Sequence, residues 1–482
     1  MARSAGRLAF LLLGAVLASF GLSPARAEDG GYPNMNTVEG DFAMYYFVTN
    51  ATSGGFSNTA IGRGALELDA DGWENTATGS GALQSNTTGW DNTAIGVVAL
   101  DTNSTGNYNT AIGAAALENN TVDNNTATGF GALRNNTTAS GNTADGYKAL
   151  YSNTVGYENT ATGFQALYKN IGGSYPQGSF NTAHGWGGLY SNTSGYSNTA
   201  TGAGALYFND SGYDNTANGC VALYNNTSGY HNTVNGVGAL YYNKTGYNNT
   251  ANGWSTLNTN TAGFNNTAEG FDALFHSTGS NNVAVGGSAG SNITTGSNNI
   301  IIGANLLGNS ADANVTRIGS TTQKKTFIGG IYNKTVASGV GVIVNSSGQL
   351  GTVQSSARFK DDIKPMDKAS EAILALKPVT FRYKVELDPD KIPQFGLIAE
   401  QVEKVNPDLV VRGEDGKVMS VRYEAVNAML LNEFLKEHRS VQELKGIVAR
   451  QQKQIEVLTA TVQKVSEQLE LNKPTSRLIA ND

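Results

Sequence analysis

A serine and a lysine five residues apart stand where the sequence changes character. Residues 355–363 read SSARFKDDI, so Ser355 precedes Lys360 by five positions. A serine hydroxyl becomes a nucleophile only beside a base, and a lysine can be that base where burial lowers its pKa. The alternative is structural, with Ser355 or Ser356 capping a helix ahead of acidic residues and Lys360 solvated. The pair therefore predicts either a nucleophilic centre or a helix cap.

Aromatic residues at recurring positions in the middle of the chain form a second candidate site. One set lies eleven residues after a recurring glycine: Trp73, Trp90, Tyr157, Tyr196, Tyr213, Tyr230, Tyr247 and Phe264. A second set follows a recurring leucine: Tyr151, Tyr168, Tyr190, Tyr207, Tyr224 and Tyr241. A column of rings could stack on cell-surface glycans, and Tyr196, Tyr213, Tyr230 and Tyr247 are the residues expected to do so. The alternative is a stacking ladder that stabilises the protein itself.

The glycines belong to a repeat of 17 residues whose phrase is NTAIG or NTATG. The glycine of the phrase falls at positions 62, 79, 96, 113, 129, 146, 163, 185, 202, 219, 236, 253, 270, 286 and 303. One copy carries a five-residue insertion around Tyr175 and Pro176. A fixed period this short is typical of a solenoid, in which each copy forms one rung stacked on its neighbours. The repeat therefore predicts a mainly β fold, with a β-solenoid over residues 56–303.

The pattern inside a rung predicts which side chains point inward. Strand residues alternate between faces, so the alanine two residues before the glycine and the leucine four residues after it should form the core. Asparagine precedes every repeat glycine by four positions, from Asn58 to Asn299, and we expect asparagine and glycine to form the corners. A 17-residue rung encloses few side chains, so its ratio of core to surface is poor. We therefore expect a homotrimer in which several chains wrap into a trimeric β-roll.

Composition and charge narrow the classes of function. Residues 1–27 read as a signal peptide with an apolar run at 8–20 and Ala25-Arg26-Ala27 before the cleavage point. The mature chain should therefore be secreted or displayed on a cell surface, with no further membrane span. Residues 28–303 carry 5 Lys+Arg against 18 Asp+Glu, whereas residues 304–482 carry 24 against 21. Neither part forms a basic stripe, so nucleic acid is not expected as a partner.

Other chemistry finds little support in the sequence. The single cysteine, Cys220, excludes a disulfide framework, and the histidines of the repeat sit at different rung positions. We therefore expect no metal and no cofactor. A glycan-degrading enzyme of the tail-spike kind remains an alternative, although the repeat offers no carboxylate pair with acid–base context.

The chain on either side of the repeat divides into shorter segments. We expect an N-terminal segment at 28–55, a β-rich neck at 304–354, an α/β module at 355–433, a coiled coil at 434–473 and a tail at 474–482. The heptad positions of the coiled coil are Phe434, Val441, Val448, Ile455, Val462 and Leu469, with Leu430, Leu444, Leu458 and Val465 at the second core position. Gln451 is a polar register marker among them.

Two resemblances to known families follow from these motifs. Residues 56–303 resemble the head repeats of trimeric autotransporter adhesins and the β-solenoid shafts of phage tail fibres. Residues 355–445 resemble the C-terminal intramolecular chaperone of phage tail spikes and endosialidases, serine peptidase family 74. The matching phrases are Ser355 to Ile363, LKPVTF at 376–381, GLIAEQV at 396–402 and VRY at 421–423.

The second resemblance implies a function. In that family a trimeric module helps the fibre to fold and then cleaves the peptide bond before the serine. Here Ser355 would be the nucleophile, Lys360 the general base and Gln354–Ser355 the scissile bond, cut once per chain. The sequence departs from the family pattern at Ser356, where many relatives have Asp or Asn, and at Gln394, where many have His. If that His supports cleavage, the chain would keep the chaperone and cut slowly or not at all. A separate alternative is a passive surface adhesin with an uncleaved coiled-coil stalk.

Overall fold

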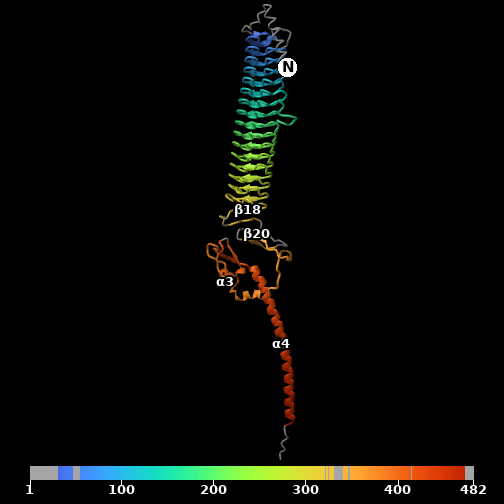
Figure 1. Cartoon of the computed structure of the whole chain (residues 1–482), viewed down its shortest axis with the longest axis vertical. Helices are drawn as coiled ribbons and strands as arrows, with labels where there is room; N and C mark the ends of the chain where they lie inside the picture. The colour runs from blue at the N-terminus through green and yellow to red at the C-terminus, as the bar shows by residue number, and fades with distance from the viewer. Residues whose placement is uncertain are drawn as a thin grey trace, which may run out of the picture. The chain divides into compact units, whose positions relative to one another are not determined.

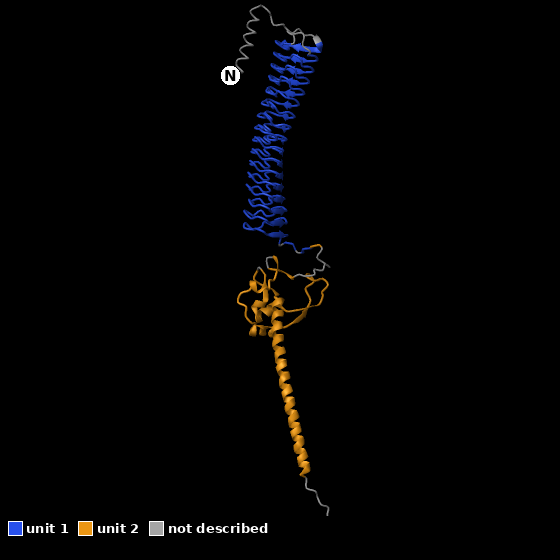
Figure 2. Ribbon diagram, turned by 90° about the vertical axis from the view of Figure 1, so that its right-hand side faces the viewer, with its two compact units in different colours: residues 1–327 blue, residues 328–482 orange. Residues whose placement is uncertain are grey.

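The computed structural model describes residues 31–46, 55–320, 322–323, 325–329, 340–345, 348–413 and 415–472. They belong to two compact units, residues 1–327 and 328–482 (Figure 2). The predicted signal peptide and the tail at 474–482 lie outside the described residues. Within the described ranges, no helix combines the length and apolar character needed to cross a membrane.

Unit 1 is a stack of short parallel strands, one for each rung (Figure 1). Neighbouring strands pair in register, so Ala200 lies beside Ala183 on one side and Ala217 on the other. Most strands are the Thr-Ala-x of the repeat phrase, with the central residue buried. The prediction of a mainly β chain with a 17-residue-repeat solenoid is therefore confirmed.

The strands of unit 1 form one 18-stranded sheet, which the short antiparallel β1 (Gly31–Tyr32) joins ahead of the 3-10 turn η1 (Pro33–Met35). The parallel strands are β2 (Asn36–Glu39), β3 (Thr59–Ile61), β4 (Thr76–Thr78), β5 (Thr93–Ile95), β6 (Thr110–Ile112), β7 (Thr126–Thr128), β8 (Thr143–Asp145), β9 (Thr160–Thr162), β10 (Thr182–His184), β11 (Thr199–Thr201), β12 (Thr216–Asn218), β13 (Thr233–Asn235), β14 (Thr250–Asn252), β15 (Thr267–Glu269), β16 (Val283–Val285), β17 (Ile300–Ile302) and β18 (Thr316–Ile318).

The hydrophobic core of the solenoid closes within one chain. The alanine column in the strands and the leucine column from Leu66 to Leu274 are fully buried, as predicted. The residue before each leucine, an alanine in most rungs, is buried as well and completes the core. Because these side chains lose all contact with water inside a single chain, burying the rung core does not require other chains. Assembly into a trimer would therefore depend on other surfaces of the chain.

Two columns of asparagine have buried side chains that hydrogen-bond the backbone at the corners. Asn215 donates from Nδ2 to Asn198 Oδ1 at 3.0 Å and to the carbonyl of Gly229 at 2.9 Å, and its backbone N–H also donates to Asn198 Oδ1. The second column, seven residues after the glycine, repeats the arrangement, as Asn209 does with Asn192 and Gly212. A buried amide is tolerated only when its donors and acceptors are paired. The ladders therefore satisfy the backbone that turns between faces.

The recurring glycine is required where the chain leaves each strand. Gly219 has φ +135°, and a Cβ placed there would lie 2.6 Å from the carbonyl oxygen of Gly236 in the next rung. A side chain would therefore clash with backbone that cannot move without breaking the stack. This part of the prediction for the corners is confirmed.

The stack extends beyond residues 56–303 at both ends. Strand β2 carries the phrase NTVEG at 36–40, with Val38 buried in the alanine position. At the other end β18 pairs with β17, and Arg317 occupies the position of the core alanine. Its guanidinium binds Asp312 at 2.8 Å and 3.0 Å, and this lowers the pKa of the Asp312 carboxyl. An ion pair in place of an apolar side chain ends the core with a polar layer.

Unit 2 is a small α/β body followed by a long helix. Its core contains Val402, Leu409, Val421 and Met429. Its elements are the hairpin β19 (Val342–Val344) and β20 (Leu350–Thr352), the 3-10 segments η2 (Ala357–Phe359), η3 (Asp367–Ala375) and η4 (Pro407–Leu409), the pairs β21 (Val379–Phe381) with β22 (Gln394–Gly396) and β23 (Val410–Arg412) with β24 (Val418–Val421), and the helices α3 (Ala399–Val405) and α4 (Tyr423–Leu471). Helix α4 runs without a break across the boundary expected at residue 433.

The closed core leads to a prediction for the solenoid alone. A chain of residues 28–327 should fold and remain a monomer, because its Ala, Leu and Asn columns need no partner. Light scattering after size-exclusion chromatography should give the mass of one chain, and circular dichroism should show a cooperative β melt. A trimer, or an unfolded chain, would contradict a core closed within one chain.

Leu206→Ala, which removes a fully buried side chain, should lower the unfolding free energy of this chain by about 2–5 kcal/mol.

Candidate serine–lysine site

A single 3-10 turn brings the predicted pair together. Strand β20 ends at Thr352, and η2 begins five positions later, at Ala357. The backbone N–H of Phe359 donates to the carbonyl of Ser356 at 3.0 Å, and that of Lys360 donates to Ala357 at 3.1 Å. These two bonds fold the segment back, so the lysine side chain can reach the residue before the turn.

The lysine contacts the first of the two serines. Lys360 Nζ lies 3.3 Å from Ser355 Oγ, within hydrogen-bond distance. Ser356 stands at the N-cap position of η2, but its side chain accepts no capping hydrogen bond. The geometry therefore favours Ser355 as the partner of Lys360 and does not support a side-chain cap by Ser356.

Both side chains of the pair are exposed in the single chain. Within the described residues no carboxylate forms an ion pair with Lys360, and the neighbouring Arg358 lies over the ring of Phe359 at 4.6 Å. A lysine serves as the base for a serine where it is buried. The contact thus has the reach required for catalysis, but the pair lacks this burial.

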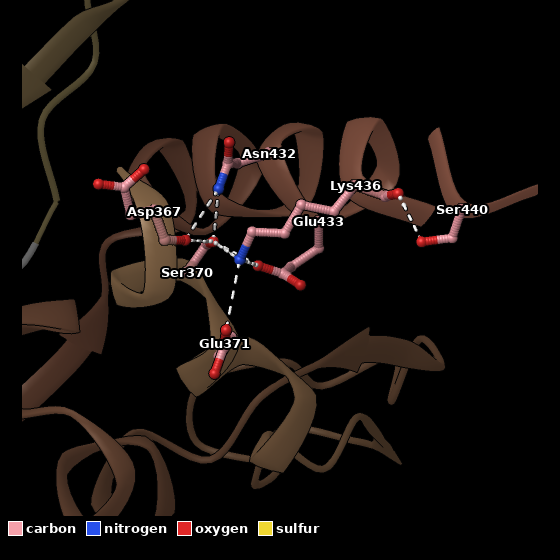
Figure 3. A network of polar contacts seen from close by, with 7 residues as sticks. All are labelled: Asp367, Ser370, Glu371, Asn432, Glu433, Lys436 and Ser440. Carbon is pink, nitrogen blue, oxygen red and sulfur yellow. Dashed lines mark hydrogen bonds and ion pairs between the residues drawn. The ribbon is translucent and has the colours of Figure 1, made fainter. Parts of the chain in front are cut away.

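A second serine–lysine contact in unit 2 has a different environment. Figure 3 shows Ser370 of η3 facing helix α4, where Asn432 Nδ2 donates to its hydroxyl oxygen at 2.7 Å and Lys436 Nζ lies 3.4 Å away. The Ser370 hydroxyl donates to Glu433 Oε1, which also accepts from Lys436 Nζ at 2.7 Å. Ser370 is fully buried. Sequence reasoning missed this network, because Ser370 and Glu433 lie 63 positions apart in the chain.

The charges around Lys436 assign this second contact a structural role. Hydrogen bonding to Glu433 raises the pKa of Lys436, and the ammonium in turn lowers the pKa of the Glu433 carboxyl. Glu371 lies 3.6 Å from the same ammonium. A lysine held protonated by two carboxylates is a poor base, so the network fixes η3 on α4 rather than activating Ser370.

Two of the sequence phrases are joined by one tyrosine. The backbone N–H of Leu397 donates to the hydroxyl of Tyr423 at 3.0 Å. A Cβ on Gly396 would lie 2.8 Å from that hydroxyl, so glycine is needed for the close approach. Gln394, beside them in β22, pairs with Phe381. In the described part of the chain it makes no hydrogen bond to Ser355 or Lys360.

The predicted glycan-stacking tyrosines stack on one another. Tyr196, Tyr213, Tyr230, Tyr247 and Phe264 form a ladder with ring centroids 4.9 Å apart and planes within 5° of parallel. In the interior of the ladder both faces of each ring are covered by its neighbours, so no face is left for a sugar. This geometry is the one expected of a ladder that stabilises the solenoid.

Comparison with known proteins identifies the C-terminal region. A family model described as chaperone of endosialidase matches residues 355–411, the segment that begins at Ser355. No curated protein and no solved structure matches the chain. The suspected chaperone behind a solenoid is thus confirmed, over a shorter stretch than residues 355–445. The chain combines a chaperone-of-endosialidase region with an N-terminal β-solenoid, an organisation that indicates a fibre-like or tail-spike-like protein.

Proposed function

We propose that the chain is an exported fibre subunit whose C-terminal module assembles three copies and then cuts itself free at Gln354–Ser355. The observation that carries the proposal is the 3.3 Å contact between Lys360 Nζ and Ser355 Oγ at the start of the matched region. Cleavage there would separate the solenoid and neck, residues 28–354, from the chaperone and helix, residues 355–482.

The reaction is a single turnover within one chain. Lys360 takes the proton of Ser355 Oγ, and the oxygen bonds to the carbonyl carbon of Gln354. The bond from that carbon to the nitrogen of Ser355 breaks, and the nitrogen takes the proton from Lys360. Water then hydrolyses the ester, leaving a carboxyl group on Gln354 and restoring the hydroxyl. The serine attacks the bond that precedes it, so no pocket for a separate substrate is required.

Exposed apolar side chains in unit 2 support assembly into an oligomer. Helix α4 leaves its heptad residues in water, with Val448 61% and Leu458 67% exposed. The hairpin β19–β20 is apolar on both faces, because Val342, Ile343 and Val344 are all exposed. A lone two-stranded hairpin is marginally stable, and surfaces of this kind are buried by partners. The chaperone family implies a trimer, and heptad packing of α4 provides one.

Assembly would also supply what the serine–lysine pair lacks. Burial lowers the pKa of a lysine, and a base with a pKa near the working pH accepts a proton efficiently. Neighbouring copies that cover the pair would therefore activate it only after the module has folded and trimerised. Cleavage would then follow assembly rather than compete with it.

Point substitutions at the pair test the proposal. Wild-type chains should yield two fragments by denaturing mass spectrometry, the second beginning at Ser355. Ser355→Ala removes the nucleophile and Lys360→Ala removes the base, so each should give a single uncut chain. Ser356→Ala is the matched control and should cut as the wild type does. Cutting in the Ser355→Ala protein would reject this assignment, and loss of cutting in Ser356→Ala alone would move the scissile bond by one residue.

A further inference from the structure

One face of the solenoid carries cations and no carboxylates over part of its length, although unit 1 is acidic as a whole. The basic tyrosine face consists of the residues one, two, five and six positions after the repeat glycines, from Phe130 to Thr259, because the residues at positions three and four are buried in the core. It contains no aspartate or glutamate, although residues 28–303 hold 18 Asp+Glu. The acidic residues of the same rungs stand at other positions: Asp145, Glu158, Asp210 and Asp214. Three of the five cations of residues 28–303 lie on this face: Arg134, Lys148 and Lys169.

A continuous row of tyrosines runs along the basic tyrosine face. Its six members stack with ring centroids 4.9–5.3 Å apart: Tyr151, Tyr168, Tyr190, Tyr207, Tyr224 and Tyr241. Stacking covers the ring faces, so ring edges and hydroxyls are left for water or a ligand. Partial burial and the neighbouring hydroxyls of Tyr190 and Tyr224 raise the pKa of Tyr207, which keeps its hydroxyl protonated. The row is thus a line of hydrogen-bond donors at the rung spacing.

Two ammonium groups stand beside this row without a carboxylate partner among the described residues. Lys148 Nζ lies 5.2 Å from the ring centroid of Tyr147 and 5.3 Å from that of Tyr151, and Lys169 Nζ lies 5.6 Å from that of Tyr190. A hydrogen bond to Tyr147 raises the pKa of Lys148, so this group stays charged. Arg134 differs, because it pairs with Glu118.

Half-exposed aromatic rings border the charged groups. Four such rings directly follow a repeat glycine, and each is 41–53% exposed: Phe130, Tyr147, Phe164 and Trp186. The face therefore offers cations, phenol donors and apolar ring edges in adjacent columns, repeated from rung to rung. Carboxylate or sulfate groups on a sugar chain would contact the cations and the phenol donors, and the C–H groups of its rings would contact the aromatic edges.

We propose that the basic tyrosine face binds an acidic polysaccharide laid along the stack. Five rung steps of about 4.8 Å give the tyrosine row a length of roughly 24 Å, so it matches a chain of sugars rather than a single one. The acidic remainder of the solenoid repels polyanions and confines the ligand to this face. A single-stranded nucleic acid is disfavoured, because its bases need open ring faces and these rings cover one another. This site is separate from Tyr196, Tyr213, Tyr230 and Tyr247.

Binding of defined polymers tests the proposal. The mature full-length chain carrying Ser355→Ala keeps cleavage out of the measurement, so the outcome is independent of the proposed self-cleavage. Immobilised protein is titrated with polygalacturonate, dextran sulfate, neutral dextran and a single-stranded oligonucleotide. At least one acidic polymer should bind in a salt-dependent manner, and neutral dextran should not. Failure of both acidic polymers to bind, or equal binding of neutral dextran, would overturn the proposal.

Matched variants locate the site on this face. Lys148→Gln with Lys169→Gln should weaken binding of the acidic polymer at least tenfold. Arg63→Gln with Lys244→Gln removes the same charge from outside the face and should leave binding within twofold. Tyr190→Phe with Tyr207→Phe keeps the stacked rings but removes two donors, and should weaken binding severalfold without changing the melt. Equal losses in the two charge variants, or an oligonucleotide that competes with the polysaccharide, would refute this site.

Discussion

Glutamate at Val448 and Ile455 should turn the protein into a monomer and stop its cleavage. Both side chains are exposed in the single chain, so the substitutions cost an isolated helix little. In a three-stranded coiled coil the same positions bring three carboxylates together in an apolar seam, where unpaired charge is strongly unfavourable. Light scattering should give the mass of one chain, and denaturing mass spectrometry should give an uncut chain.

The control for this prediction places equal charge on the outer surface of the helix. Ala460→Glu with Gln463→Glu adds two carboxylates outside the heptad core positions of α4. This protein should remain an oligomer and should cut as the wild type does. If the Val448→Glu, Ile455→Glu chain is monomeric yet fully cut, the serine–lysine pair needs no partner copy, and our account of its activation is wrong.

Asp69 should make the N-terminal rungs less stable as the pH rises. It occupies the inward position that most other rungs give to asparagine, and it is fully buried. Asn86 donates to its carboxylate at 2.7 Å, but burial dominates and raises the pKa of Asp69 to about 7. Because the pKa of Asp69 in the folded chain lies above its ordinary value of 3.8, stability is greatest below pH 3.8 and declines until the pH passes about 7.

Asp69→Asn should remove this dependence on pH. A shift from 3.8 to about 7 corresponds to a penalty on the order of 4 kcal/mol at high pH. The variant should therefore match the wild type near pH 4 and protect the amides of residues 55–92 more strongly from hydrogen exchange at pH 8. Asp145→Asn, on the exposed side of β8, should show no such gain. Equal protection of wild type and Asp69→Asn at pH 8 would contradict a buried charge.

The repeat made the solenoid predictable, because the same residue type recurs at the same position of many rungs. A small residue two before the glycine and a leucine four after it point inward in rung after rung, and the structure confirms both columns. The asparagine column seven residues after the glycine was equally regular, but polar residues are expected outside. Only the stacked geometry shows that amides of adjacent rungs satisfy one another. The rung at NTVEG, whose glycine Gly40 precedes Gly62 by 22 positions, was missed, although the step from Gly163 to Gly185 has the same length.

The candidate site was predictable in its residues and not in its surroundings. Spacing and the family resemblance selected Ser355 and Lys360, and a local turn explains their contact. The network at Ser370 depends on η3 packing against α4, a long-range contact for which the sequence carries no periodic signal. Likewise, the charge separation on the basic tyrosine face appears only when residues 17 apart are seen as neighbours.

Native mass spectrometry of the purified wild-type protein tests the central claim most directly, because it reports subunit number and chain ends together. The account predicts a complex of three fragments that begin at Ser355, and a solenoid chain that ends at Gln354. An uncut single chain would contradict the proposed assembly and self-cleavage, and a trimer of uncut chains would contradict the claim that assembly activates the serine–lysine pair.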